Sequence, residues 1–328
     1  MCRFQKMLNL KFGLLSYLSF FFLIVFFQNF CNAQQLPQIG FYEENLFILN
    51  PGVTGIEEET LIATAAFRRQ WTGINQSPYS AMLSAHSPFE NAKIAAGAYL
   101  LHDKTGPTGY SELGLSLSYQ IFLGKYDRRK IYIGKSNRLT YKKLSFGFSA
   151  NLAQYRLLGS DVVNRNLSDP AVLQTDASKI FPSASFGIFY RAPSFYVGFS
   201  VPQLLNLKIE FTEPGAIASI TREQHYYFIL GGKIYFMDEQ MAFEPSLLLK
   251  FASASPLQAD LVFRFRSFNI GWLGFGYRSK NALRFEAGFS ISKMVHFGYV
   301  YDLPLANYSS ILGQSHEAVV HLKFRQGR

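Results

Sequence analysis

The chain has 328 residues, a formal net charge of +10 and an aromatic content of 16%. Its two cysteines, Cys2 and Cys31, both lie near the N-terminus. The rest of the chain therefore cannot contain a disulfide framework, a catalytic thiol or a cysteine metal site. Beyond the first 33 residues no run of apolar residues is long enough for a membrane-spanning helix, which needs about 18 or more.

The first 33 residues have the pattern of a cleaved signal peptide. Basic residues precede an apolar run from Leu14 to Phe27, and Cys31-Asn32-Ala33 then resembles a cleavage site. A retained membrane anchor is the alternative, but the run is short and ends in small and polar residues. We therefore expect an exported protein whose mature chain starts at Gln34.

Residues 113–123 alternate strictly between an apolar and a small or polar side. A period of two over this length exceeds the usual strand of a soluble protein, about five or six residues, and suits a tilted strand that crosses a bilayer. The apolar side consists of Leu113, Leu115, Leu117, Tyr119, Ile121 and Leu123. The pattern recurs to the end of the chain and predicts an all-β protein, a transmembrane antiparallel β-barrel.

Alternation and turn signals predict about 14 strands. They are expected near 60–71, 78–87, 92–102, 109–123, 143–156, 181–191, 194–202, 223–237, 241–253, 256–266, 268–278, 281–292, 294–302 and 313–325. An even number places both barrel ends of the chain in the periplasm, with long odd-numbered loops outside. The long connections 157–180, 203–222 and 303–312 all have odd numbers, in agreement with this topology.

Charged residues also fall on the side of the late strands that would face the lumen. Their mixed signs favour a network of paired charges, and a selective pore constriction is the alternative. These residues are Asp260, Arg264, Arg266, Arg284 and Glu286.

Three regions are expected: a signal peptide at 1–33, a periplasmic N-terminal segment at 34–59 and an outer-membrane barrel at 60–328. The N-terminal segment has acidic residues, among them Glu43 and Glu44, around an apolar patch at 46–49. It could plug the lumen or bind a partner at the periplasmic mouth.

One even-numbered, hence periplasmic, link is unusually long and basic. Residues 124–143 hold eight basic residues against Asp127, a net charge of +7. A solvated loop is the simpler interpretation, and docking to an acidic periplasmic partner is the other. The candidate partner-binding residues are Lys125, Arg128, Arg129, Lys130, Lys135, Arg138, Lys142 and Lys143.

No catalytic, cofactor-binding or metal site is expected. Ser315, His316 and Glu317 are consecutive, but neighbours on a strand point to opposite faces and cannot form a relay. The remaining histidines lack ligand spacing. Because these motifs are missing, we predict a non-enzymatic protein without cofactors. Nucleic acid is not expected as a partner in the periplasm.

Ordered motifs at both ends of the mature chain carry a family resemblance. Asn50-Pro51-Gly52-Val53-Thr54-Gly55 is followed by Arg68-Arg69-Gln70-Trp71-Thr72-Gly73, and near the end Gly298-Tyr-Val-Tyr-Asp302 precedes Gly313-Gln-Ser-His-Glu317. With these motifs the chain resembles the PorP/SprF family of outer-membrane proteins of the type IX secretion system and gliding machinery of Bacteroidetes. Gly52, where the family commonly has Ala, and an inserted Gln314 depart from its pattern. The matching positions are Asn50, Pro51, Gly55, Arg69, Trp71, Asp302, Gly313, Ser315, His316 and Glu317.

The resemblance implies an outer-membrane location and an accessory role in secretion. Such a barrel would help to secrete, hold or anchor a cognate cell-surface protein, for example an adhesin with a C-terminal sorting domain. Its expected partners are outer-membrane lipid, this surface protein and periplasmic ring components of the secretion system. An outer-membrane diffusion channel or substrate transporter is the alternative.

Overall fold

The computed structural model describes residues 37–57, 60–89, 93–124, 142–159, 175–213, 216–237, 240–252, 255–279, 281–305 and 309–325. The strands belong almost entirely to one compact unit, Gln34–Ser253 with Leu257–Arg328. Among the described residues, no helix has the length and apolar character needed to cross a membrane.

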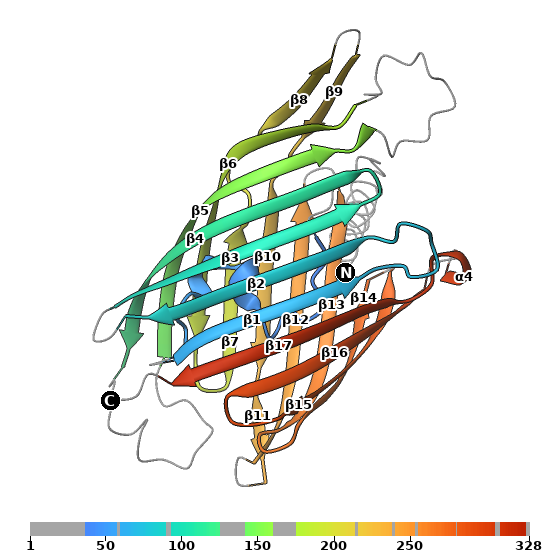
Figure 1. The fold of residues 1–328 in the computed structure, drawn as a ribbon. Coiled ribbons are helices and arrows are strands. Elements are labelled where there is room, and N and C mark those ends of the chain that lie inside the picture. Colours follow the sequence, from blue (N-terminus) through green and yellow to red (C-terminus); the bar gives the residue numbers. More distant parts are fainter. Residues whose placement is uncertain are drawn as a thin grey trace, which may run out of the picture. The chain divides into compact units, whose positions relative to one another are not determined.

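The chain forms two short helical turns and then a series of antiparallel strands (Figure 1). The turns are α2 (Leu46–Leu49) and the 3₁₀ turn η1 (Pro51–Val53). The strands of the first half are β1 (Thr60–Arg69), β2 (Tyr79–Pro88), β3 (Ile94–Thr105), β4 (Thr108–Leu123), β5 (Lys142–Leu157), β6 (Ala177–Arg191) and β7 (Phe195–Val201). Those of the second half are β10 (His225–Gly232), β11 (Ile234–Phe236), β12 (Met241–Ala252), β13 (Ser255–Ser267), β14 (Gly271–Arg278), β15 (Ala282–Ser290), β16 (Val295–Pro304) and β17 (Ser315–Arg325).

These strands close into a barrel. Successive strands pair with each other, β1 pairs with β17 and β7 pairs with β10. Both β10 and β11 pair with β12, so they are one barrel strand interrupted at Lys233. The ring therefore has the 14 strands that the sequence predicts, and the predicted fold class is confirmed.

The two ends of the barrel differ in their connections. Thr60 pairs with Arg325, so the start of β1 and the end of β17 share one end, which we call the terminal end. The connections after β5, β7 and β16 lie at the opposite end, which we call the loop end. These three long connections therefore share the loop end, as the sequence-based topology predicts, whereas the long connection from β4 to β5 joins strand ends at the terminal end.

One connection contains structure that the sequence analysis missed. The hairpin of β8 (Lys208–Glu213) and β9 (Ala216–Thr221) lies within the predicted loop 203–222. Ile209 and Phe211 are buried in a cluster with Tyr110 and Phe181. The alternation of these two apolar residues over β8 is the signal that could have revealed the hairpin. A short helix, α4 (Ser309–Leu312), lies in the last connection.

The alternation of the sequence is confirmed as an outside and an inside. The Leu115 side chain, near the middle of β4, is 60% exposed, whereas that of Ser116 is 2% exposed. The outward apolar side chains need a surrounding of lipid, because exposed apolar patches of this extent are not stable in water. Barrel closure satisfies the backbone hydrogen bonds that a bilayer cannot satisfy.

Leu115→Arg tests this placement. A cation on the lipid face near the middle of a strand should lower the free energy of unfolding by about 2–4 kcal/mol. Reversible denaturant unfolding in lipid vesicles measures the change, and Leu115→Phe is the control, because it keeps an apolar side chain there. Equal stability of the two variants would contradict a lipid-facing Leu115.

Candidate functional site

Residues 37–57, which we call the plug, lie inside the barrel. Phe41 and Tyr42 are completely buried, and the plug contacts inward-facing residues of strands all around the ring. In Figure 1 the blue plug runs within the ring of strands. Most of the segment that we expected as a periplasmic N-terminal segment, 34–59, is therefore folded into the lumen.

The first part of the plug is held by the wall near the loop end. The Glu317 carboxylate accepts hydrogen bonds from Gly40 N at 2.7 Å and Phe41 N at 3.2 Å. Arg284 Nη1 donates to Gly40 O at 2.6 Å. The wall thus pairs the plug backbone, which has no regular secondary structure here, as burial requires.

The helical turns of the plug are fixed by Asn50. Its Oδ1 caps η1 by accepting from Gly52 N at 2.8 Å. Its Nδ2 donates to the carbonyl oxygens of Ile188 at 3.1 Å and Phe199 at 3.2 Å, which belong to β6 and β7. One side chain thus caps the turn and attaches it to the wall. This role explains an Asn followed by Pro51, since proline suits the first position of a helical turn.

Wall glycines allow the plug to approach the strands closely. A Cβ on Gly147 would lie 2.1 Å from the backbone of Pro51, and one on Gly187 would lie 2.0 Å from Asn50 Oδ1. Neither position could hold a side chain without moving the plug. Glycine inside a strand normally weakens it, so these two positions have a packing reason.

The last part of the plug contacts the terminal end. Gly55 has a left-handed backbone with φ of +62°, and its N donates to His86 Nδ1 at 3.0 Å. Lys143 Nζ donates to Ile56 O at 3.1 Å and Gln120 Oε1 at 2.9 Å. Glu57 pairs with Lys323 at 3.2 Å. From here the chain enters β1.

Lys143 corrects one of the sequence predictions. Its side chain is fully buried against the plug, so it does not belong to an exposed partner-binding group. Its period-two position on β5 directs it inward, and the basic composition of the link concealed this. Lys142 is exposed. The other six candidates, Lys125, Arg128, Arg129, Lys130, Lys135 and Arg138, lie outside the described residues.

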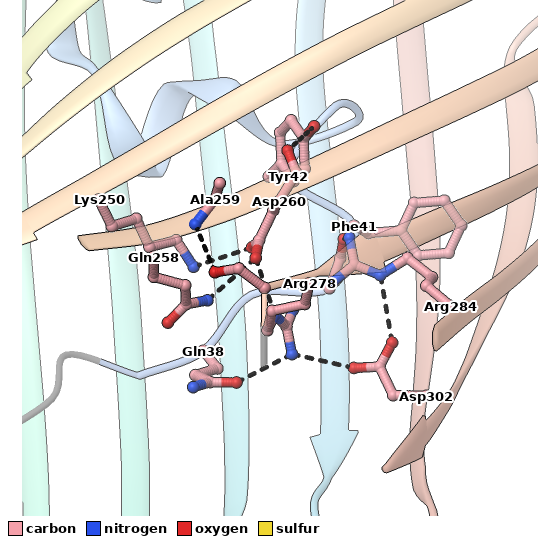
Figure 2. Close-up of polar contacts among 12 residues, drawn as sticks. Gln38, Phe41, Tyr42, Lys250, Gln258, Ala259, Asp260, Arg278, Arg284 and Asp302 are labelled. Carbon is pink, nitrogen blue, oxygen red and sulfur yellow. Dashed lines mark hydrogen bonds and ion pairs between the residues drawn. The ribbon is translucent and has the colours of Figure 1, made fainter. Parts of the chain in front are cut away.

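A cluster of buried ion pairs surrounds Asp302 near the loop end. Its carboxylate lies 2.7 Å from Arg68, 3.2 Å from Arg278 and 3.1 Å from Arg284. Arg278 also pairs with Asp260 at 3.0 Å and donates to Gln38 of the plug at 2.9 Å. Figure 2 shows Arg278 between these partners, with Arg284 on the other side of Asp302.

A second cluster binds the acidic residues of the plug. Arg264 lies 2.6 Å from Glu44, 3.5 Å from Glu43 and 2.6 Å from Glu286. Arg266 lies 2.6 Å from Glu44. The interior charges thus form the paired network that the sequence favours, with plug carboxylates as part of it.

The two adjacent plug carboxylates differ in their partners. Glu44 lies 2.6 Å from both Arg264 and Arg266. Glu43 lies 3.5 Å from Arg264 and accepts a hydrogen bond from Ser246 Oγ at 2.8 Å. Glu44 is therefore the main charged anchor of the plug in the second cluster.

The family-motif positions separate into two groups. Asn50, Pro51 and Gly55 belong to the plug, and Glu317 bonds to its backbone. Asp302 pairs with Arg278 and Arg284, which in turn bond to the plug. The others lie at the loop end of the strands they belong to or flank. Trp71 N donates to Ser315 Oγ at 3.2 Å, and Arg69 Nε donates to Ser77 at 2.7 Å. The Tyr299 hydroxyl is hydrogen-bonded to His316 at 2.5 Å. Gly313 has a left-handed backbone and lies beside Gly73.

Sequence reasoning missed Arg68 and Arg278 as parts of the plug-binding site. Arg68 lies next to the motif position Arg69, yet it is the residue that points inward and is 1% exposed. Strand parity alone could have shown this, because adjacent residues face opposite sides. The partners of Arg68 are Asp302 and Glu317, which lie 234 and 249 residues further along the chain. No local sequence pattern indicates pairing over such a separation.

A closed barrel with a lipid-facing apolar surface and a filled polar lumen defines an outer-membrane β-barrel protein. The chain belongs to the PorP/SprF family, type IX secretion system membrane proteins, whose family model matches residues 31–322. The protein is thus an outer-membrane component of the type IX secretion system. The family comprises secretion-system membrane proteins and is not an enzyme family.

Solved outer-membrane barrels show more distant likeness, and no curated protein sequence matches the chain. The P. putida toluene transporter TodX has 11% identity and a TM-score of 0.46, over 86% of this chain and 94% of that chain. A Pseudomonas aeruginosa FadL homologue has 8% identity and a TM-score of 0.44, over 85% and 93%. The Acinetobacter baumannii outer membrane protein Omp33 has 9% identity and a TM-score of 0.42, over 83% and 100%. Likeness this remote carries no functional conclusion.

Asp302→Asn should destabilise the barrel strongly. The change leaves three buried guanidinium groups around one neutral amide, and breaking a buried pair in this way costs about 3–5 kcal/mol. Denaturant unfolding in lipid vesicles measures the loss. Glu210→Gln removes an exposed ion pair with Lys208 and is the matched control, with unchanged unfolding expected. A wild-type midpoint for Asp302→Asn would contradict the proposed importance of the cluster.

Gly147→Ala should loosen the plug while the barrel remains folded. The added methyl group meets the Pro51 backbone, and overpacking of this kind costs about 1–3 kcal/mol. Limited proteolysis of folded protein should cut the plug faster than in the wild type. Gly109→Ala is the control, because its Cβ would be 3.7 Å from Arg156 Cβ, an ordinary contact. Identical proteolysis of the two variants would refute a tight fit at Gly147.

Proposed function

We propose that this protein is a non-conducting platform of the type IX secretion system that helps to secrete, hold or anchor a cognate cell-surface protein. The filled lumen is the observation that carries this proposal. Both ion-pair clusters use plug residues or bind the plug backbone, so the plug is part of the folded barrel. A passage for solutes would require breaking these buried pairs, at a cost of several kcal/mol each.

The loop end supports recognition of a surface protein. With short periplasmic turns and longer external loops, as in bacterial outer-membrane barrels, the loop end faces the cell surface and the terminal end the periplasm. The β8–β9 hairpin is then external and held firmly, since Arg222 Nη2 donates to Tyr110 OH at 3.0 Å and stacks on Phe181. A rigid scaffold that presents structured loops is suited to binding a cognate partner, such as an adhesin with a C-terminal sorting domain.

The terminal end supports contact with periplasmic components of the machine. A cavity of about 240 Å³ at this end is lined by plug and wall residues, among them Glu57, His321 and Lys323. The link 124–142 joins the end of β4 to the start of β5, and both of these strand ends lie at the terminal end. Without the buried Lys143 its seven basic residues and Asp127 give a net charge of +6, which favours an acidic partner among the ring components.

Deletion of the gene tests the proposed role. Particular surface proteins should be lost from the cell envelope, while the uptake of small solutes stays unchanged. Quantitative surface proteomics measures the first and a dye-permeability assay the second. An unaltered surface proteome would refute the role, and a selective loss of uptake would favour the alternative of a diffusion channel or substrate transporter.

Planar-bilayer recording tests the plug directly. The full barrel should show no steady open steps, whereas a variant that lacks residues 37–57 should conduct, because the lumen loses its filling. Heat-modifiability on gels controls for folding of the shortened chain. Steady conductance of the full barrel would contradict a non-conducting platform.

A further inference from the structure

The outer surface of the neighbouring strands β2 to β6 has a hollow of about 490 Å³ near the loop end (Figure 1). Ser111 of β4, the middle strand, lies in its lining between His102 of β3 and Gln154 of β5, its partners in strand register. Residues opposite each other on neighbouring strands share a face, and Leu113, two positions from Ser111, points outward. Most of the lining residues have this outward position, so the hollow opens to the outside of the barrel.

The hollow lies at the outer edge of the apolar surface. The outward side chains of β4 are apolar from Leu123 back to Leu113, ten positions or about 33 Å along the strand. At the usual strand tilt of about 40° this length covers about 25 Å of membrane thickness, the height of the apolar band of an outer-membrane barrel. Ser111 and Gly109 follow beyond this band. With the loop end at the cell surface, they lie at the level of the headgroups of the outer leaflet.

The part of the hollow within the apolar band is lined by leucines. Leu83, Leu100, Leu113 and Leu152 line it and stand opposite one another on β2 to β5. Leu83, Leu100 and Leu152 are each more than half exposed. Acyl chains cover such a surface in a bilayer, and a hollow offers a chain more van der Waals contacts than a smooth wall does.

Polar and cationic groups lie next to this apolar part, toward the loop end. His102 Nδ1 and Ser111 Oγ are hydrogen-bonded to each other at 2.9 Å. In the next outward row of the register, Lys104 of β3 and Arg156 of β5 flank Gly109 of β4. Their Cα atoms are two strand spacings apart, about 10 Å, so both side chains can reach one phosphate group. Within 4 Å a Cβ on Gly109 would meet only Arg156 Cβ, at 3.7 Å, which leaves room between the two cations.

We propose that this hollow binds one phosphorylated, acylated glycolipid of the outer leaflet, the class of lipid to which lipid A belongs. An acyl chain lies in the apolar part, and a phosphate group lies between Lys104 and Arg156. Cations near a membrane surface attract anionic headgroups, and the row that holds these two has no acidic residue from β2 to β6. Its positions are Tyr79, Lys104, Gly109, Arg156 and Ser178. This lipid site is separate from the plug and from the proposed role in secretion.

Binding of lipid A to the purified full-length barrel in detergent tests the proposal, with native mass spectrometry to count the bound lipid. The paired change Lys104→Gln with Arg156→Gln should weaken binding about 30-fold, at the usual contribution of two cations near an anionic membrane surface. Ser111→Leu fills the hollow without a change of charge and should weaken binding as well. Lys142→Gln with Lys293→Gln removes two exposed cations at the terminal end and is the matched control, with unchanged binding expected.

Each outcome bears on one part of the proposal. Heat-modifiability on gels restricts the comparison to folded variants. Unchanged binding by the pair at 104 and 156, or an equal loss in the control pair, would overturn the phosphate site. Unchanged binding by Ser111→Leu would overturn the placement of an acyl chain in the hollow. Phosphatidylglycerol, an anionic phospholipid, is the second probe, and binding as tight as that of lipid A would overturn a glycolipid as the occupant.

Discussion

The pairing of buried charges is the constraint on which the rest of this structure depends. Arg68, Arg264 and Arg284 are almost completely buried in the lumen. An unpaired guanidinium at such a site is very costly, so each requires an anionic partner. Asp302, Glu286 and the plug carboxylates supply these partners. The wall therefore depends on the plug for the pairing of its buried charges, and the plug depends on the wall in the same way.

This mutual dependence explains features that look unrelated in the sequence. Glycines in β5 and β6 leave room for the turn at Asn50, so that its amide reaches backbone oxygens of the wall. Small polar residues on the inner face, such as Ser246 and Ser118, bond to the plug without filling its space. The inner surface is thus shaped for one particular segment of the same chain, while the outer surface needs only to be apolar.

The strand pattern was predictable because it depends on local alternation. The strands 60–71, 109–123 and 241–253 were placed within two residues at each boundary, since the lipid and lumen faces impose opposite polarity on neighbouring residues. The course of 37–57 was not predictable, because its contacts join positions far apart in the chain, from 31 residues for Gly55 and His86 to 204 for Tyr42 and Ser246. Lys143 shows the same limit, since composition suggested an exposed basic group where strand parity directs the side chain inward.

The position of the plug has a consequence for biogenesis. The seam between β1 and β17 joins the first and last strands of the ring, so it closes only when the whole barrel has been made. A segment whose leading end lies at the far mouth is most simply placed there while that seam is open. Placing the plug before closure avoids threading it through a closed ring, and its Glu44 carboxylate can then pair with the arginines of β13. The N-terminal segment would then act as a template around which its own barrel assembles, and the path of the chain would determine the order of folding.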